Sequence, residues 1–370
     1  MVKTIRYGLI GVGTMGQEHL RNLALIPGSQ VTALADPHEA SLQTALTHTP
    51  DQPQCFASAE ALLASDLCDA LIIASPNDQH FATMKMLFQR GPALPLLVEK
   101  PVCTNGADCL ALAELAAHYA APIWVGMEYR YMPPVQAVRA ALAAGEAGKV
   151  QMIAMREHRF PFLVKVDDWN RFARRTGGTL VEKCCHFFDL MRLIAEADAV
   201  RVYASGAPDV NHRDELYDGN VPDIIDNAFV IIDFANGRRA ALDLCMFAQG
   251  SGWQEEFAVT GSAGKVECLV PPDENFSTAG QGRKAEIIVS PRAPQGPRRR
   301  EIEVDAAVLK AGHHHGATYF QHLGFRKTVL EGAPVEVSLD DGLKAVVIGL
   351  AAELSIRERR AIAIDGLKFG

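Results

Sequence analysis

Long apolar runs, the Cys-x-x-Cys spacing and an excess of basic charge are all lacking in this sequence of 370 residues. No segment approaches the roughly eighteen uninterrupted apolar residues of a membrane-spanning helix, so we predict none. The eight cysteines include no Cys-x-x-Cys pair, which argues against a zinc ribbon and indicates reduced thiols. The net charge of −8 argues against a nucleic-acid partner, because such binding needs a concentrated basic face.

Enough apolar material is present to build large buried cores. Hydrophobic residues make up 48% of the chain and charged residues 22%, which is ordinary for a folded protein and too apolar for disorder. The length exceeds the size at which one core stops growing, so we expect two domains. The first residues pass directly into an apolar run, so we expect no signal peptide and a cytoplasmic location.

The N-terminal segment has the pattern of a dinucleotide-binding βαβ unit. An apolar run leads into Gly11-Val-Gly13-Thr-Met-Gly16, and the next apolar run ends at Asp36. Gly11 permits a tight turn, Gly13 lets the backbone approach a pyrophosphate, and Gly16 lets the helix pack closely. A carboxylate suits a free ribose 2′-hydroxyl, so we predict NAD rather than NADP; a purely structural glycine turn is the alternative. The predicted cofactor contacts here are Gly11, Gly13, Thr14, Met15, Gly16 and Asp36.

Apolar runs alternate with helical patterns up to about residue 125. This rhythm predicts a doubly wound parallel sheet, with ligands beyond the carboxyl ends of its strands. We therefore assign residues 1–125 to a Rossmann domain and 126–370 to a second, α+β domain. The runs in the first domain are Ile5 to Ile10, Val31 to Ala35, Ala70 to Ala74, Leu96 to Val98 and Ile123 to Val125.

The second domain has longer alternating runs with hairpin signals such as Asn236-Gly237 between them, which favours a mainly antiparallel sheet. Pro271 to Gly282 and Pro291 to Arg300 resemble loops, and helical patterns return at Ala317 to Glu331 and Leu339 to Arg359. The runs are Val150 to Arg156, Val200 to Ser205, Ala228 to Phe234, Ala240 to Met246, Glu255 to Gly261, Lys265 to Leu269 and Ala285 to Val289.

Polar residues follow two of the apolar runs of the first domain, at the edge where a ligand is expected. We predict cofactor contacts for Pro76, Asn77 and His80, and capping of the next helix by Asn77 is the alternative. Glu99 and Lys100 follow a buried run, where charges are costly unless they are paired or useful. We expect both to line the cofactor crevice, with Lys100 donating to a substrate hydroxyl; a surface salt bridge is the alternative.

A histidine lies between two carboxylates further along the chain. Helical spacing puts Glu182, His186 and Asp189 on one face at positions i, i+4 and i+7. Such a histidine is an oriented general base, whereas a satisfied histidine at a domain junction is the alternative. A metal site using Cys184, Cys185 and His186 is disfavoured because adjacent helical residues point in different directions around the axis, and we predict no metal.

Three consecutive histidines, His313 to His315, precede a predicted helix. They are compatible with metal binding, substrate contact or simple capping, and the sequence does not separate these interpretations. We include His315 among the predicted substrate contacts.

Taken together, these motifs resemble the Gfo/Idh/MocA oxidoreductases, the glucose-fructose oxidoreductase and inositol dehydrogenase group, over nearly the whole chain. The resemblance implies a Rossmann domain followed by a substrate-binding and oligomerisation domain with a large open sheet, whose C-terminal helices pack back on the first domain. It also implies a homodimer or homotetramer. The residues that carry the resemblance are the glycine motif, Pro76, Asn77, His80, Glu99, Lys100, Pro101, Gly177, Gly178, Glu182, His186 and Asp189.

The resemblance also implies a reaction. His186 removes a proton from a secondary alcohol of a sugar, sugar acid or cyclitol, Lys100 hydrogen-bonds the reacting oxygen, and hydride passes to NAD. Glu182, an aspartate in many members, is implied to line the site. An NAD-dependent glycosidase that oxidises C3 transiently and eliminates the aglycone is the alternative, and a cofactor-binding sensor is a third reading.

Basic residues gather just before the predicted catalytic helix, and others follow the last run of the first domain. Arginine binds carboxylate, phosphate or sulfonate well, so an acidic sugar is one substrate hypothesis. Pairing of these arginines with nearby carboxylates is the alternative. The predicted substrate contacts, besides His315, are Arg130, Tyr131, Arg156, His158, Arg171, Arg175 and Asp189.

Overall fold

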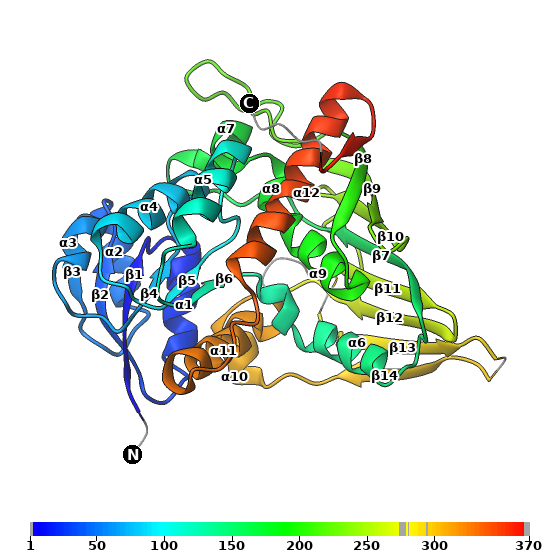
Figure 1. Cartoon of the computed structure of the whole chain (residues 1–370), viewed down its shortest axis with the longest axis horizontal. Coiled ribbons are helices and arrows are strands. Elements are labelled where there is room, and N and C mark those ends of the chain that lie inside the picture. The colour runs from blue at the N-terminus through cyan, green and yellow to red at the C-terminus, as the bar shows by residue number, and fades with distance from the viewer. Residues whose placement is uncertain (1–2, 274–278, 280, 294, 366–370) are drawn as a thin grey trace.

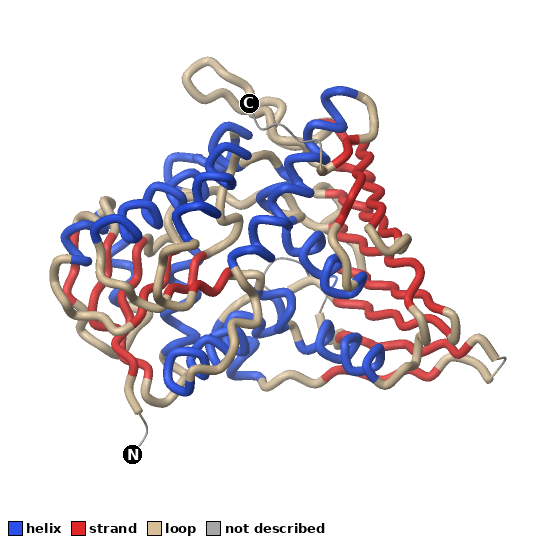
Figure 2. Tube along the Cα trace, in the orientation of Figure 1, coloured by secondary structure: helices blue, strands red, loops and turns tan. Residues whose placement is uncertain are grey.

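The computed structural model describes residues 3–273, 279, 281–293 and 295–365. Two sheets lie at opposite sides of the molecule, with helices between them (Figures 1 and 2). The first sheet is parallel, has the order β3-β2-β1-β4-β5-β6 and confirms the predicted Rossmann arrangement. Its strands are β1 (Ile5–Ile10), β2 (Ser29–Ala35), β3 (Gln54–Phe56), β4 (Ala70–Ile73), β5 (Leu96–Val98) and β6 (Ile123–Val125).

Helices follow the strands of this sheet in the doubly wound manner. Helix α1 packs beside α2, and α4 packs beside α5. The prediction missed β3, because this edge strand has only three residues, Gln54–Phe56, and is mostly exposed. The helices are α1 (Thr14–Leu23), α2 (Glu39–Leu46), α3 (Ala59–Leu63), α4 (His80–Arg90) and α5 (Gly106–Ala116).

The second sheet has the order β14-β13-β12-β11-β7-β10-β9-β8-β15. Its pairs are antiparallel except for β7 with β10, which confirms the predicted mainly antiparallel sheet. Its strands are β7 (Val150–His158), β8 (Ala199–Ala207), β9 (Asn227–Phe234), β10 (Arg239–Cys245), β11 (Glu255–Gly261), β12 (Gly264–Val270), β13 (Ala285–Pro291), β14 (Arg298–Ile302) and β15 (Ile362–Ala363).

One segment predicted as a loop is a strand instead. Arg298 to Arg300 belong to β14, which pairs with β13 at the edge of the second sheet. Their side chains are exposed, and Arg298 contacts Glu146 at 2.6 Å. An edge strand needs no apolar alternation and is often charged, which explains why its sequence reads as a loop. The other expected loop, 271–282, lies partly outside the described residues.

The C-terminal helices join the two parts of the molecule. Helix α12 contacts β8 and α9 of the second domain and also α5 and β6 of the first, while α11 contacts α1. The amide of Val125 donates to the carbonyl of Val337 at 3.0 Å. These helices therefore contact the surroundings of both sheets. The remaining helices are α6 (Pro133–Ala143), α7 (Ala173–Thr176), α8 (Thr179–Glu182), α9 (Cys185–Ala195), α10 (Ala306–Ala311), α11 (Ala317–Glu331) and α12 (Leu339–Glu358).

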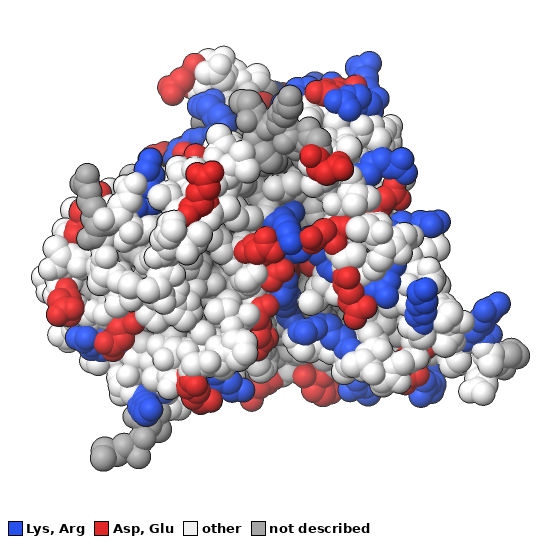
Figure 3. Space-filling model, in the orientation of Figure 1, with Lys and Arg blue, Asp and Glu red and all other residues white. Residues whose placement is uncertain are grey.

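Charged side chains of both signs lie among one another on the face shown in Figure 3. Within the described part of the chain, no helix combines the length and the apolar character needed to cross a membrane.

Candidate active site

A cleft of about 630 Å³ runs from the carboxyl ends of the parallel strands to the second domain. Its lining brings together most of the residues predicted for cofactor and catalysis. Those are Gly11, Gly13, Thr14, Met15, Asp36, Pro76, Asn77, His80, Glu99, Lys100, Glu182 and His186. Of the predicted substrate residues, Arg175 also lines the cleft.

The glycine loop is shaped as the motif requires. Gly11 has φ +85°, and a Cβ there would lie 2.3 Å from the amide nitrogen of Ser75. A Cβ on Gly16 would lie 2.4 Å from the carbonyl oxygen of Gly11, so this residue sits behind the loop and holds it against the helix. A Cβ on Gly13 would meet nothing within 4 Å, which leaves room for a pyrophosphate at the start of α1.

The end of β2 presents a fixed carboxylate to the same cleft. Asp36 accepts hydrogen bonds from the amides of Val12 and His38, both at 2.9 Å. Two buried polar atoms of neighbouring loops, Oγ of Ser75 and Nδ2 of Asn77, have no hydrogen-bond partner among the residues that the structure describes. A glycine cradle, an acidic residue and unpaired polar groups in one cleft fit a dinucleotide.

His80 and Glu99 are held by buried partners. The ring nitrogens of His80 lie 2.8 Å from the carbonyl oxygens of Pro101 and Ser75, so this histidine ties the two loops together. Glu99 lies 3.0 Å from Nε2 of His19. Burial opposes a charge on Glu99, but the hydrogen bond from His19 and the positive charges of His19, Lys100 and His80 together outweigh it and lower the pKa of Glu99.

Lys100 reaches across the cleft to the second domain. Its Nζ donates to the carbonyl oxygen of Glu182 at 3.1 Å. Burial opposes the positive charge, yet the nearby Cys185, Glu128 and Glu182 outweigh it and raise the pKa of Lys100. The residue therefore remains a cation that can stabilise a developing alkoxide.

The predicted continuous helix is broken between Glu182 and His186. Helix α8 ends at Glu182 and α9 begins at Cys185, so Lys183 and Cys184 separate two helices. Glu182 and His186 still line the cleft, but Asp189 does not. Burial raises the pKa of Glu182 to about 7, against the attraction of Lys100 and Lys165, so this carboxyl group titrates near neutrality.

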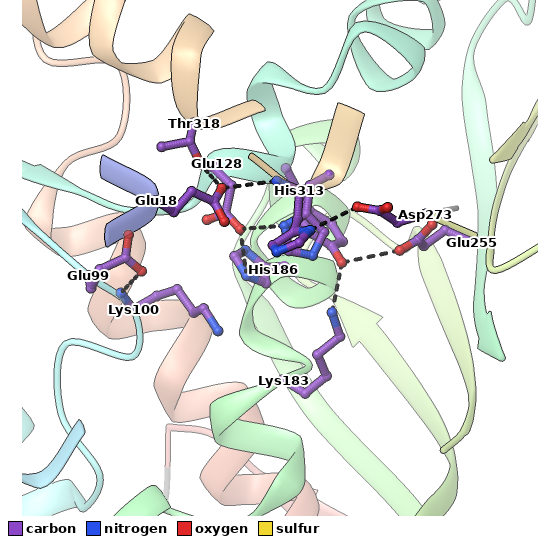
Figure 4. A network of polar contacts seen from close by, with 12 residues as sticks. Glu18, Glu99, Lys100, Glu128, Lys183, His186, Glu255, Asp273, His313 and Thr318 are labelled. Carbon is purple, nitrogen blue, oxygen red and sulfur yellow. Dashed lines mark hydrogen bonds and ion pairs between the residues drawn. The ribbon is translucent and has the colours of Figure 1, made fainter. Parts of the chain in front are cut away.

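His186 is enclosed by aromatic and carboxyl groups. Its ring stacks on Tyr129, with the centroids 4.2 Å apart and the planes 8° from parallel. Its Nε2 lies 3.4 Å from Oε1 of Glu128, and the two side chains face each other in Figure 4. Burial, reinforced by repulsion from Lys100 and Lys183, lowers the pKa of His186 well below its ordinary value. The imidazole is therefore neutral and available as a base.

Behind this histidine lies a polar network that the sequence did not predict. Lys183 donates to the hydroxyl of Tyr129 at 2.7 Å and contacts Glu157 at 2.9 Å. The same hydroxyl donates to Glu255 at 3.4 Å. Lys183, Arg159, Lys165 and His314 line the cleft as well, although they were not among the predicted contacts. The sequence holds one indication of these residues, which is that they lie close along the chain to residues predicted for the site.

Several predicted substrate residues are instead paired away from the cleft. The guanidinium of Arg130 donates to both carboxylate oxygens of Asp189, at 2.5 and 2.6 Å, and both side chains are buried. This ion pair explains why neither residue faces a ligand. The others outside the cleft lining are Arg156 with Glu256, His158 with Asp243, Arg171 with Glu215, Tyr131 with Glu336, and His315 near the Pro271 carbonyl. Arg175, at the rim, contacts Asp78 at 2.8 Å.

The consecutive histidines His313 to His315 have different surroundings. His314 lines the cleft, whereas His313 contacts Asp273 at 2.8 Å. Among residues 3–273, 279, 281–293 and 295–365, no group of three histidine, cysteine or carboxylate side chains is placed to hold a metal ion.

Known proteins resemble the chain over nearly its full length. Residues 5–127 match the family model described as "Oxidoreductase family, NAD-binding Rossmann fold", and residues 139–364 match "Oxidoreductase family, C-terminal alpha/beta domain", both of the Gfo/Idh/MocA group. This match confirms the predicted NAD cofactor. The inositol 2-dehydrogenase of Rhizobium meliloti is 26% identical over 365 residues, covering 98% of this chain and 99% of the relative.

Solved structures share the fold. An oxidoreductase from Agrobacterium radiobacter, in complex with NAD+, L-tartaric acid and magnesium, superposes with a TM-score of 0.77 at 19% identity, covering 98% of this chain and 99% of that one. GenD2 from gentamicin A biosynthesis, in complex with NAD, gives 0.76 at 21% identity, covering 98% and 97%.

Proposed function

Because this chain belongs to the Gfo/Idh/MocA family of NAD-binding oxidoreductases, we propose that it transfers hydride between NAD and a secondary alcohol of a sugar, sugar acid or cyclitol. The observation that carries this proposal is the meeting of Lys100 and His186 in the cleft that the glycine loop opens. We place the boundary between the cofactor and substrate domains near residue 125. The inositol 2-dehydrogenase relative supports a polyol substrate.

The cofactor would lie along the first domain's wall of the cleft. The N-terminal amides of α1 would face the pyrophosphate, and Asp36 would accept hydrogen bonds from a ribose. Asn77 and Ser75 offer unpaired polar groups to the remaining part of the molecule. When bound, NAD supplies the hydride acceptor.

The proton chemistry falls to the second wall and to Lys100. Neutral His186 takes the proton of the substrate hydroxyl, and the Lys100 ammonium hydrogen-bonds the oxygen as negative charge develops. Glu182, whose pKa is raised to about 7 mainly by burial, lines the same cleft and helps to orient the substrate. Each of these residues comes from a different loop or helix, so the domain contact assembles the site.

An acidic substrate receives support from two cations that the cleft contains. Lys165 has no ion-pair partner within the described part of the chain, and burial lowers its pKa. An anion bound beside Lys165 in the cleft would therefore stabilise the charged form of this lysine. Arg159 contacts Glu157 only at 3.4 Å, while Lys183 holds the same carboxylate at 2.9 Å. We therefore place the carboxylate of a sugar acid between Arg159 and Lys165.

A substrate panel tests the function. Neutral sugars, uronates, sulfosugars and inositols are incubated with NAD while NADH absorbance and sugar products are followed. We expect steady NADH from at least one polyol or sugar acid, and none from Lys100→Met. Glycoside cleavage without net NADH would support the glycosidase alternative, and no change in any compound would contradict the proposal.

The outer face of the second sheet supports a homodimer or homotetramer. Met152, Tyr203, Phe229 and Ile231 are exposed there, and register places Tyr203 beside Ile231. Exposed apolar patches of this kind mark association surfaces. Sedimentation analysis measures the number of chains in the assembly.

The eight unpaired thiols are in keeping with a reducing compartment such as the cytoplasm.

A further inference from the structure

A buried carboxyl group, Glu128, lies behind His186 and between two histidines. Its Oε1 is 3.4 Å from Nε2 of His186 and 3.4 Å from Nδ1 of His314. The three residues come from distant parts of the chain, after β6, on α9 and before α11. Figure 4 shows Glu128 facing His186 on the side away from Lys183. The side chain of Glu128 is 2% exposed, that of His186 is 1% exposed and that of His314 is 21% exposed.

We propose that Glu128 accepts the proton that leaves His186 during catalysis and that His314 carries it on to water. This inference rests on the proposed function. The substrate O–H bond breaks as an N–H bond forms at Nδ1 of His186, which has no partner among the described residues. The Nε2–H bond then breaks as an O–H bond forms on Glu128, and His314 relays that proton outward. The carbon atom that bears this hydroxyl gives up its hydride to NAD, so the substrate becomes a carbonyl compound.

The surroundings favour a proton on the carboxyl group over one on either histidine. Burial raises the pKa of Glu128 to about 8, and the nearby Glu99 and Glu18 act in the same direction while Lys100 opposes them. Burial also lowers the pKa values of His186 and His314 well below their ordinary range. The contacts of 3.4 Å are long for hydrogen bonds, but catalytic contacts commonly tighten when substrate binds.

Two matched substitutions test the relay. Glu128→Gln keeps the shape of the side chain but removes its proton chemistry, whereas Glu18→Gln removes a buried carboxyl group that bonds Thr318 and contacts neither histidine. In the wild type, alcohol oxidation should rise with pH through a step near 8, and carbonyl reduction should fall through the same step. We expect Glu128→Gln to lose this step and to lower kcat by about 10- to 100-fold.

The control should keep the step and move it. Glu18→Gln removes a charge that disfavours ionisation of Glu128, so its step should lie at lower pH by under about one unit. His314→Asn should keep the step but increase the solvent isotope effect on kcat. Should Glu128→Gln fail to bind NAD, Glu128→Asp replaces it, with the step retained and kcat reduced. An unchanged pH profile and kcat in Glu128→Gln would overturn the relay.

A readout without turnover separates this inference from the proposed function. The ring nitrogens of His186 are followed by nuclear magnetic resonance in the NAD-loaded protein as pH is varied. Wild type should show a step near pH 8 that Glu128→Gln abolishes, even if no compound in the substrate panel reacts. If the step persists in Glu128→Gln, the two side chains are not coupled and the inference is wrong, whichever substrate the enzyme uses.

Discussion

The two walls of the cleft hold their polar groups in different ways. The Rossmann wall relies on backbone shape: a glycine turn, the amides of α1 and an aspartate fixed by two amides. The opposite wall buries ionisable side chains against one another, among them Glu128, Lys183 and His186. The first arrangement suits recognition of a constant cofactor, and the second shifts pKa values, which suits proton transfer. Cofactor recognition thus lies mainly on the first wall, and the proton chemistry lies on the second wall together with Lys100.

The largest effect is expected from a substitution on the second wall, at His186. His186→Ala should lower kcat by about 10²- to 10⁴-fold because it removes the base, while leaving the NAD dissociation constant close to that of the wild type. Steady-state kinetics and a fluorescence titration with NADH measure the two quantities. A comparable loss of NAD affinity would show that the walls do not act separately.

Ion pairs beyond the cleft should affect stability rather than chemistry. Arg130→Met leaves Asp189 as an unpaired buried charge, so we expect the free energy of unfolding to fall by about 3–5 kcal/mol. Arg201→Met is the matched control, since its pair with Asp233 is exposed and should contribute under about 1 kcal/mol. Urea unfolding measures both. A raised KM without loss of stability in Arg130→Met would instead show that Arg130 contributes to substrate binding.

Two glycines sharpen the description of the Rossmann wall. Gly13→Ala should raise the NAD dissociation constant roughly tenfold with little change in Tm, because its Cβ enters only the space for the pyrophosphate. Gly16→Ala should lower Tm as well, because its Cβ would press on the carbonyl of Gly11. Calorimetry and NAD titration of both variants provide the comparison, and equal Tm losses would refute this distinction.

The smallest expected effect is at Asp36. Asp36→Ser should weaken NAD binding only a few-fold, since a single hydrogen bond contributes about 1 kcal/mol, and should improve NADP binding by removing charge repulsion. Affinities for both cofactors measure this. If wild type already binds NADP as tightly as NAD, the carboxylate does not select the cofactor.

The same contrast explains what the sequence could predict. Gly11, Asp36 and Lys100 each follow an apolar run, and the motif spacing sufficed to place them in one cleft. Helical periodicity did not reveal the interruption between Glu182 and His186. Asp189 follows His186 on the same helix α9, but it pairs with Arg130 and does not line the cleft. Arg130 meets Asp189 and Glu128 meets His314 across long sequence separations, which no local pattern reveals. Arginine clustering could not show which arginines reach the cleft, because carboxylates from distant segments pair with Arg130, Arg156 and Arg171.

The hydrogen bond from Val125 to Val337 also bears on the order in which the protein matures. Parts of the cofactor wall depend on the C-terminal helices: His322 of α11 lies 2.9 Å from His19, which in turn holds Glu99. During synthesis, the first 125 residues leave the ribosome long before these partners exist. Domains usually fold as the chain emerges. Here the nucleotide wall gains its contacts with His322 and Val337 only after those residues have been made, so we expect full cofactor affinity only from the finished chain.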